Sequence, residues 1–313
     1  MKTISKNEFE EIKTWMYRNA RPLELAIWKY EFENGSKEDV LSVLSYYQNE
    51  DGGFGNALEP DNWNPNSTPY TTLNAIDKLK EINFTDINHP IFKGIFKFLE
   101  SGIHNNENSW KFNIPTNDNY PHAPWWNYNE EANEYESIGV SAGIASFLLK
   151  YADKDSKLYK KAYTKAIQLM EKLYTPNNLG DMGIDGYITL RNTILQLGLT
   201  NNFDMEFISK AIKGLVNVSI ERDVTKWEFY VNKPSNFITS PNSEYYKENE
   251  EIMQKELDYI IETRPENGVW GITWSWFEHN DKYPKEFAIS EHWWKADIVI
   301  KKLKLLRSFG RVE

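Results

Sequence analysis

Apolar side chains recur at every third or fourth position along most of the chain, which is the spacing of amphipathic α-helices. Ser36 is the predicted N-cap of one helix, with Asp39 at the position that completes a capping box. Gly52 and Gly53 are expected to stop this helix. Further helices are predicted at residues 68–82, 89–100, 137–151, 155–173, 187–198, 203–219, 249–263 and 287–308.

The segment 102–136 has a different pattern, because it is rich in asparagine and proline and has few periodic apolar positions. Loops of this length are uncommon in compact domains and are often functional. In the helix that follows, small side chains predict the close approach of another helix: Gly139, Ser141, Ala142, Gly143 and Ala145. Two short aromatic runs, 227–231 and 269–274, alternate too poorly for strands.

These patterns predict an all-α fold in which helix pairs stack and share a core. We expect a single domain over residues 1–313, with the helices closed into an α/α toroid and long loops at one mouth. Net charge is −10 without a basic cluster, so nucleic acid and anionic membrane surfaces are unexpected partners. The absence of cysteine excludes disulfides and thiolate metal sites, and no cofactor is predicted. Without a signal peptide or an apolar run of membrane-spanning length, a soluble, cytoplasmic protein is expected.

A turn of glycines and carboxylates spans residues 48–61, and a looser copy spans residues 262–270. Leu44 to Phe54 places Gln48, Gly53 and Phe54 in the order of the QW-type repeat, and Ile260 to Trp270 is similar, with Glu262 in the position of the glutamine. The chain therefore resembles the superfamily of squalene–hopene cyclases and protein prenyltransferases, especially its short bacterial members. The resemblance implies an α/α toroid in which Gln48 ties helix ends together and Phe54 stacks on the next turn.

The chain lacks the catalytic and metal-binding motifs that are typical of that superfamily. It has neither the Asp-x-Asp-Asp motif of proton-initiated cyclases nor the Asp-Asp-x-x-Asp motif that holds magnesium. It also has no cysteine for the zinc site of protein prenyltransferases. The fold can therefore be present without the usual activity.

Three carboxylates near the first glycine turn are the predicted catalytic residues: Asp51, Glu59 and Asp61. Asp51 can instead hydrogen-bond its own turn. Glu59 and Asp61 flank Pro60, so they lie on a stiff segment that leads to Trp63. Burial beside an aromatic ring would raise the pKa of one carboxyl and keep it protonated as a general acid, and the pair can alternatively bind a cation.

Tryptophans fall mainly in predicted connecting segments, which suggests an aromatic-lined cavity as well as a core. If the helices form a ring, these segments gather at one mouth, where indole faces can stabilise carbocations or stack on sugars. The predicted substrate-binding residues are Trp63, His122, Trp125, Trp126, Trp274, Trp276, Glu278, Trp293 and Trp294. No histidine spacing typical of a metal site occurs, so no metal is predicted.

Three functions remain open from the sequence. The first is binding of a hydrophobic, isoprenoid-type molecule in an aromatic-lined central cavity, with acid-initiated catalysis by Glu59 or Asp61. The second is an intracellular carbohydrate-processing lyase or glycosidase, because tryptophan-rich clefts with two carboxylates suit sugar rings. The third is a non-catalytic binding or scaffold protein. The expected partner is accordingly a small molecule or a glycan.

Overall fold

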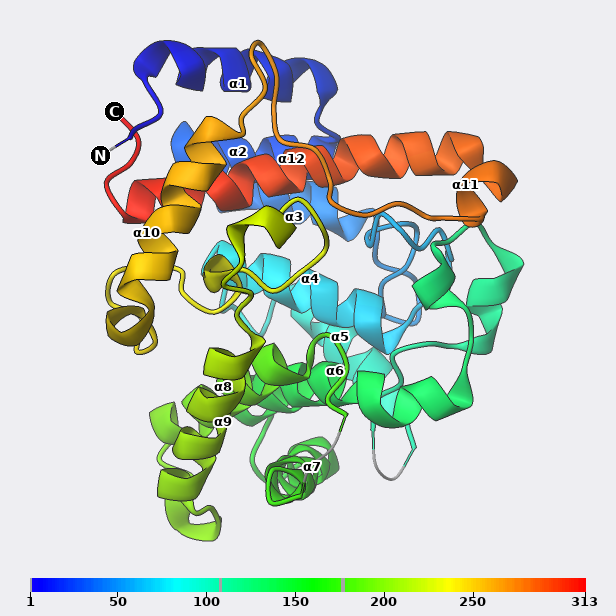
Figure 1. Ribbon diagram of the computed structural model, residues 1–313. Coiled ribbons are helices and arrows are strands. Elements are labelled where there is room, and N and C mark those ends of the chain that lie inside the picture. Colours follow the sequence, from blue (N-terminus) through cyan, green and yellow to red (C-terminus); the bar gives the residue numbers. More distant parts are fainter. Residues whose placement is uncertain (1, 107–108, 176–177) are drawn as a thin grey trace. The chain divides into compact units, whose positions relative to one another are not determined.

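The computed structural model describes residues 2–106, 109–175 and 178–313 (Figure 1). Within these ranges the secondary structure is helical, with twelve α-helices, five short 3-10 helices and only isolated β-bridges. The predicted all-α class is therefore confirmed, and the aromatic runs at 227–231 and 269–274 form no strand. Residues 107 and 108 of the predicted long loop lie outside the described residues.

The chain divides into two compact units, one of which is built from both ends of the sequence. Unit 1 comprises Met1–Val43 and Val216–Glu313, and unit 2 comprises Leu44–Leu215. The α-helices of unit 1 are α1 (Lys6–Asn19), α2 (Pro22–Phe32), α10 (Tyr246–Glu262), α11 (His279–Lys282) and α12 (Pro284–Ser308). Those of unit 2 are α4 (Pro69–Glu81), α5 (Pro90–Ser101), α6 (Glu130–Tyr151), α7 (Lys157–Lys172) and α8 (Gly183–Gln196). Two helices cross the unit boundaries: α3 (Lys37–Ser45) and α9 (Met205–Ser219).

Single 3-10 turns complete the helical elements: η1 (Pro115–Asn119), η2 (Pro124–Trp126), η3 (Thr200–Asn202), η4 (Val224–Lys226) and η5 (Pro234–Asn236). The first two lie inside the predicted long loop, where prolines fix the backbone at the start of each turn. Closure of the helices into a toroid stays a prediction.

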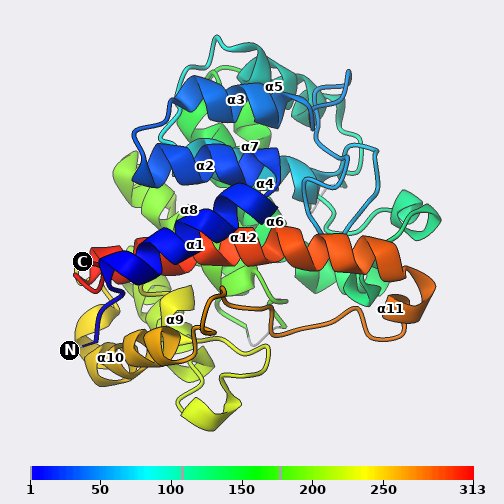
Figure 2. The same cartoon turned by 90° about the horizontal axis from the view of Figure 1, so that it is seen from above.

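Unit 1 is organised around α12, against which both α1 and α2 pack (Figure 2). The buried stripe of α12 consists of Ala296, Val299, Ile300, Leu303, Leu305 and Leu306. The two ends of the chain meet beside this layer, because Ile4 pairs with Val312 in a parallel bridge. The buried Arg311 secures that contact by donating to the Lys2 carbonyl and to Asp258, each at 2.8 Å.

Helices α1 and α2 were not predicted, although the sequence holds a signal for each start. Ser5 and Glu8 form a reciprocal capping box at the start of α1. Pro22 occupies the first turn of α2, where a proline is favourable because its missing N–H would have no helical partner.

Unit 2 is organised around α6, which packs against α7 and α8. A Cβ added to Gly186 of α8 would lie 2.8 Å from the Gly139 Cα, so the predicted close approach to the small face of α6 is confirmed. Helix α6 begins at Glu130 and not near residue 137. The Asn129 side chain caps it, and its first two turns are polar, so apolar periodicity gives no sign of the true start.

No described helix combines the length with the sustained apolar sequence that crossing a bilayer requires. Among residues 2–106, 109–175 and 178–313, no group of three acidic or histidine side chains gathers as a metal site would need.

Candidate functional site

The glycine turn of unit 2 is fastened to α5 through Gln48. Its Nε2 donates to the Gly52 carbonyl at 2.9 Å and to the Ile91 carbonyl at 3.1 Å. Gly52 has φ +94°, and a Cβ there would lie 2.1 Å from the Gly94 carbonyl oxygen. The turn therefore needs glycine for both its backbone conformation and its contact with α5.

Asp51 holds this turn closed. Its Oδ1 accepts from the Gly53 N–H at 2.9 Å and from the Ser67 hydroxyl at 2.6 Å. Phe54, fully buried, forms bridges with both Gln48 and Thr68. Asp51 has the turn-stabilising contacts of an Asx-turn, so its geometry matches the structural alternative to its predicted catalytic role.

The looser copy at residues 262–270 is held in another way. Trp270 is buried, and its indole N–H donates to the Ile260 carbonyl at 2.7 Å. Glu262, which stands in the position of the glutamine, forms an ion pair with Lys2. Here the aromatic ring, and not the residue in the glutamine position, ties the connecting segment back to the end of α10.

Glu59 and Asp61 are both buried, each with 2% of its surface exposed. The Asn74 amide of α4 donates to Glu59 Oε2 at 2.9 Å, and the Asp61 N–H lies 3.4 Å from Glu59 Oε1. The Asp61 carbonyl accepts from the Ala123 N–H at 2.9 Å. The two carboxylates thus lie on a segment fixed at one side by α4 and at the other by residues 121–123.

Trp63 and His122 belong to the same assembly. The Trp63 indole donates to the Pro60 carbonyl at 3.0 Å, and its backbone N–H donates to the Pro121 carbonyl at 2.9 Å. His122 is buried, with Nδ1 2.6 Å from the Tyr120 carbonyl and Nε2 2.8 Å from Asn127 Oδ1. Both ring nitrogens therefore have hydrogen-bond partners within the loop, and His122 links Tyr120 to Asn127.

The tryptophan pair after His122 divides between solvent and core. Trp125 is exposed, and Trp126 is buried. The Trp126 ring stacks on Phe112 at 4.6 Å and meets the edge of Tyr70 at 4.5 Å. Among the described residues, none accepts a hydrogen bond from the buried Trp126 indole N–H. We call Tyr70, Phe112 and Trp126 the aromatic cluster.

The remaining predicted residues lie in unit 1. Trp276 is fully buried, Trp274 meets Trp294 edge to face at 5.3 Å, and Glu278 is exposed. Trp293 lies beneath the Arg21 guanidinium, whose carbon is 4.9 Å from the ring centroid. Convergence of these side chains with those of unit 2 at one entrance stays a prediction.

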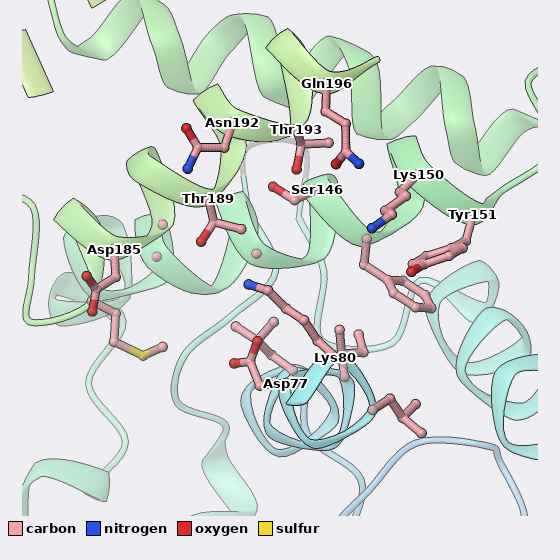
Figure 3. A pocket seen from close by; sticks show the side chains of 18 of the residues that line it. Asp77, Lys80, Ser146, Lys150, Tyr151, Asp185, Thr189, Asn192, Thr193 and Gln196 are labelled. Atoms are coloured by element: carbon pink, nitrogen blue, oxygen red, sulfur yellow. The ribbon is translucent and has the colours of Figure 1, made fainter. Parts of the chain in front are cut away.

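Unit 2 contains a cavity of about 280 Å³ that none of the predicted site residues line. It lies between α4, α6 and α8, and we call it the α4–α6–α8 cavity (Figure 3). Its apolar wall consists of Leu73, Ile76, Leu79, Phe84, Phe92 and Phe147. Its polar wall comes mainly from α8, with Thr189, Asn192, Thr193 and Gln196. The glycines of α6 predicted a close helix contact but gave no sign of this space.

Helix α4 links the cavity to the buried carboxylates. Tyr70, Asn74 and Asp77 follow one another at helical spacing and share one face. Tyr70 belongs to the aromatic cluster, Asn74 binds Glu59, and Asp77 lines the cavity. The candidate site of unit 2 is therefore the cavity together with Glu59 and the aromatic cluster, arranged along α4.

Comparisons with protein-family models, with curated proteins and with solved structures find no match.

Proposed function

We propose that this chain is a terpenoid-cyclase- or prenyltransferase-like protein that binds a small hydrophobic molecule of the isoprenoid type. The main support is the α4–α6–α8 cavity, whose apolar wall combines aliphatic and aromatic side chains. Its volume of about 280 Å³ equals roughly nine water molecules at ~30 Å³ each, enough for about ten non-hydrogen atoms. A ten-carbon isoprenoid has this size.

The proposal includes an acid-initiated step with Glu59 as the proton donor. Glu59 does not line the cavity, so this step requires the double bond to extend past the cavity to the part of α4 that carries Asn74. A carboxylic acid that donates its proton to a carbon–carbon double bond leaves a carboxylate and a carbocation. Loss of a neighbouring proton, or addition of water followed by loss of a proton, completes the reaction, and solvent returns the proton to the carboxylate. The support for this role is the hydrogen bond that Asn74 donates to Glu59. Asn74 lies one turn of α4 after Tyr70, which belongs to the aromatic cluster. Aromatic faces attract developing positive charge.

Binding is tested with geraniol, a ten-carbon isoprenoid alcohol, by titration calorimetry. The Thr189→Trp variant places an indole in the cavity and is expected to abolish binding, whereas wild type binds. Circular dichroism of the variant checks that the helices remain. Binding that is unchanged in Thr189→Trp would show that the cavity is not the site. Binding of a neutral oligosaccharide in place of geraniol would favour the carbohydrate-processing alternative.

The acid step is tested by incubating geraniol with the protein in ²H₂O. Protonation of a double bond from an exchanged carboxyl places deuterium on carbon, which mass spectrometry detects. We expect incorporation with wild type and with Glu50→Gln, which changes an exposed carboxylate in the same turn, and none with Glu59→Gln. Equal incorporation by the two variants would exclude Glu59 as the acid.

A further inference from the structure

Two lysines stand on the wall of the α4–α6–α8 cavity, on different helices. Lys80 lies in the last turn of α4, and Lys150 lies in the last turn of α6. Figure 3 shows the Lys80 side chain extending into the cavity from the side opposite α8. Among the described residues, neither Lys80 nor Lys150 forms an ion pair with a carboxylate. Both positive charges are thus available to a ligand.

The cationic part of the wall adjoins its aromatic part. Phe92 contacts Phe147 at 5.4 Å and Tyr151 at 5.3 Å between ring centroids. The Lys150 ammonium in turn lies 5.3 Å from the centroid of the Tyr151 ring. An apolar surface therefore leads directly to a positive charge, which is the arrangement that an amphipathic anion requires.

The charge of the lining favours one negative charge on the ligand over two. Asp77 and Asp185 also line the cavity, so the wall carries two carboxylates as well as the two lysines. A dianion such as a phosphate monoester would be repelled by both carboxylates. A carboxylate has one charge and can also accept hydrogen bonds from neutral groups of the polar wall, such as Thr189.

We propose that the α4–α6–α8 cavity binds an isoprenoid-type monocarboxylate, with its hydrocarbon chain on the apolar wall and its carboxylate between Lys80 and Lys150. This inference rests on the proposed function, since it names the end group of a ligand in the same cavity. It predicts that the end group, and not only the chain, decides affinity.

The experiment compares ligands that share one chain and differ in the end group: geranate, geraniol, geranylamine and geranyl phosphate. Dissociation constants are measured by titration calorimetry at low ionic strength, where charge contributions are least screened. We expect geranate to bind about tenfold more tightly than geraniol, as charge-assisted hydrogen bonds imply. Geranyl phosphate and geranylamine are expected to bind more weakly than geranate.

The double variant Lys80→Gln/Lys150→Gln tests the two lysines. Both side chains are exposed, so the fold is expected to persist, and the tenfold preference for geranate is expected to disappear while geraniol binding remains. The matched control is Lys93→Gln/Lys160→Gln, which removes two exposed lysines of α5 and α7 outside the cavity and is expected to keep the preference.

The opposite results would contradict the carboxylate inference, the role of the two lysines or the proposed function, as follows. Equal affinity for geranate and geraniol in wild type would overturn the carboxylate inference and leave the proposed function standing. Tighter binding of geranyl phosphate or geranylamine would do the same. Equal loss of the preference in the control variant would show that the two cavity lysines are not responsible. Failure of every ligand to bind would reject the proposed function itself.

Discussion

Replacement of Lys302 by methionine is expected to stabilise the protein. Lys302 lies on α12 with its ammonium 5.1 Å from the centroid of the Trp270 ring. The pKa of Lys302 is lowered from 10.5 to about 7, mainly by burial and to a smaller extent by repulsion from Lys233, while the buried Glu256 opposes both effects. The folded protein therefore holds this amine in surroundings that favour its neutral form.

The magnitude follows from the difference between the folded and unfolded pKa values. A group whose folded pKa is depressed to about 7 binds fewer protons when folded than when unfolded, so its unfavourable contribution grows as pH falls from 10.5 to 7 and is constant below. At pH 7 the penalty is about 4 kcal/mol, and at pH 9 about 2 kcal/mol, from the linkage relation. The gain in stability from Lys302→Met is smaller than these penalties, because the substitution also removes the cation–π contact of Lys302 with Trp270, worth about 1 kcal/mol.

The assay is urea denaturation followed by tryptophan fluorescence at pH 7 and at pH 9. Lys302→Met is expected to exceed wild type in unfolding free energy by up to about 3 kcal/mol at pH 7, and this advantage should shrink by about 2 kcal/mol at pH 9. The control is Lys285→Met, which replaces an exposed lysine of the same helix and should change stability by less than about 1 kcal/mol. An advantage that is the same at both pH values would refute the reasoning.

Two further substitutions test local features. Gly52→Ala should lower the unfolding free energy by more than about 2 kcal/mol, because it combines a positive φ with a clash against Gly94, whereas Gly102→Ala, with φ +72° and no atom near its Cβ, should lower it by only about 1 kcal/mol. Equal losses in urea denaturation would mean that the contact with α5 is unimportant. Glu24→Gln should lower the unfolding free energy by about 3 kcal/mol, because it removes a buried carboxylate that accepts from the buried Arg21 guanidinium at 2.6 and 2.8 Å. A loss typical of exposed pairs, below about 1 kcal/mol in the same assay, would contradict this.

Most of the helices could be predicted because each has its own apolar period and its own signals at the ends. The N-cap of α3 is an example, since the Ser36 hydroxyl accepts from the Asp39 N–H at 3.1 Å, as the sequence indicates. Where the apolar period is absent the prediction is wrong by whole turns, as at the polar start of α6 near Glu130. The local sequence thus predicts that a helix exists more reliably than it predicts the residue at which the helix begins.

The candidate site could be predicted only in part, because it depends on distances between helices. The stiffness of the segment around Pro60 is evident in the sequence, but the burial of Glu59 depends on Asn74, fifteen positions away on another element. The cavity is even harder to predict from the sequence. Its walls come from four helices, α4, α5, α6 and α8. The apolar pattern of each helix indicates a buried face without indicating that Phe92 and Thr189 leave a space between them.

The division of unit 1 between the two ends of the chain sets an order on its synthesis. Its first part, with α1 and α2, leaves the ribosome before the whole of unit 2, and translation from Val43 to Val216 takes roughly 9–35 s at about 5–20 residues per second. During this interval the apolar residues of α2, among them Leu23, Ile27 and Trp28, have no α12 to cover them. Unit 2 is a continuous segment and can fold first. Until α12 is synthesised, the exposed apolar residues of α2 form a surface that a chaperone for nascent chains can bind.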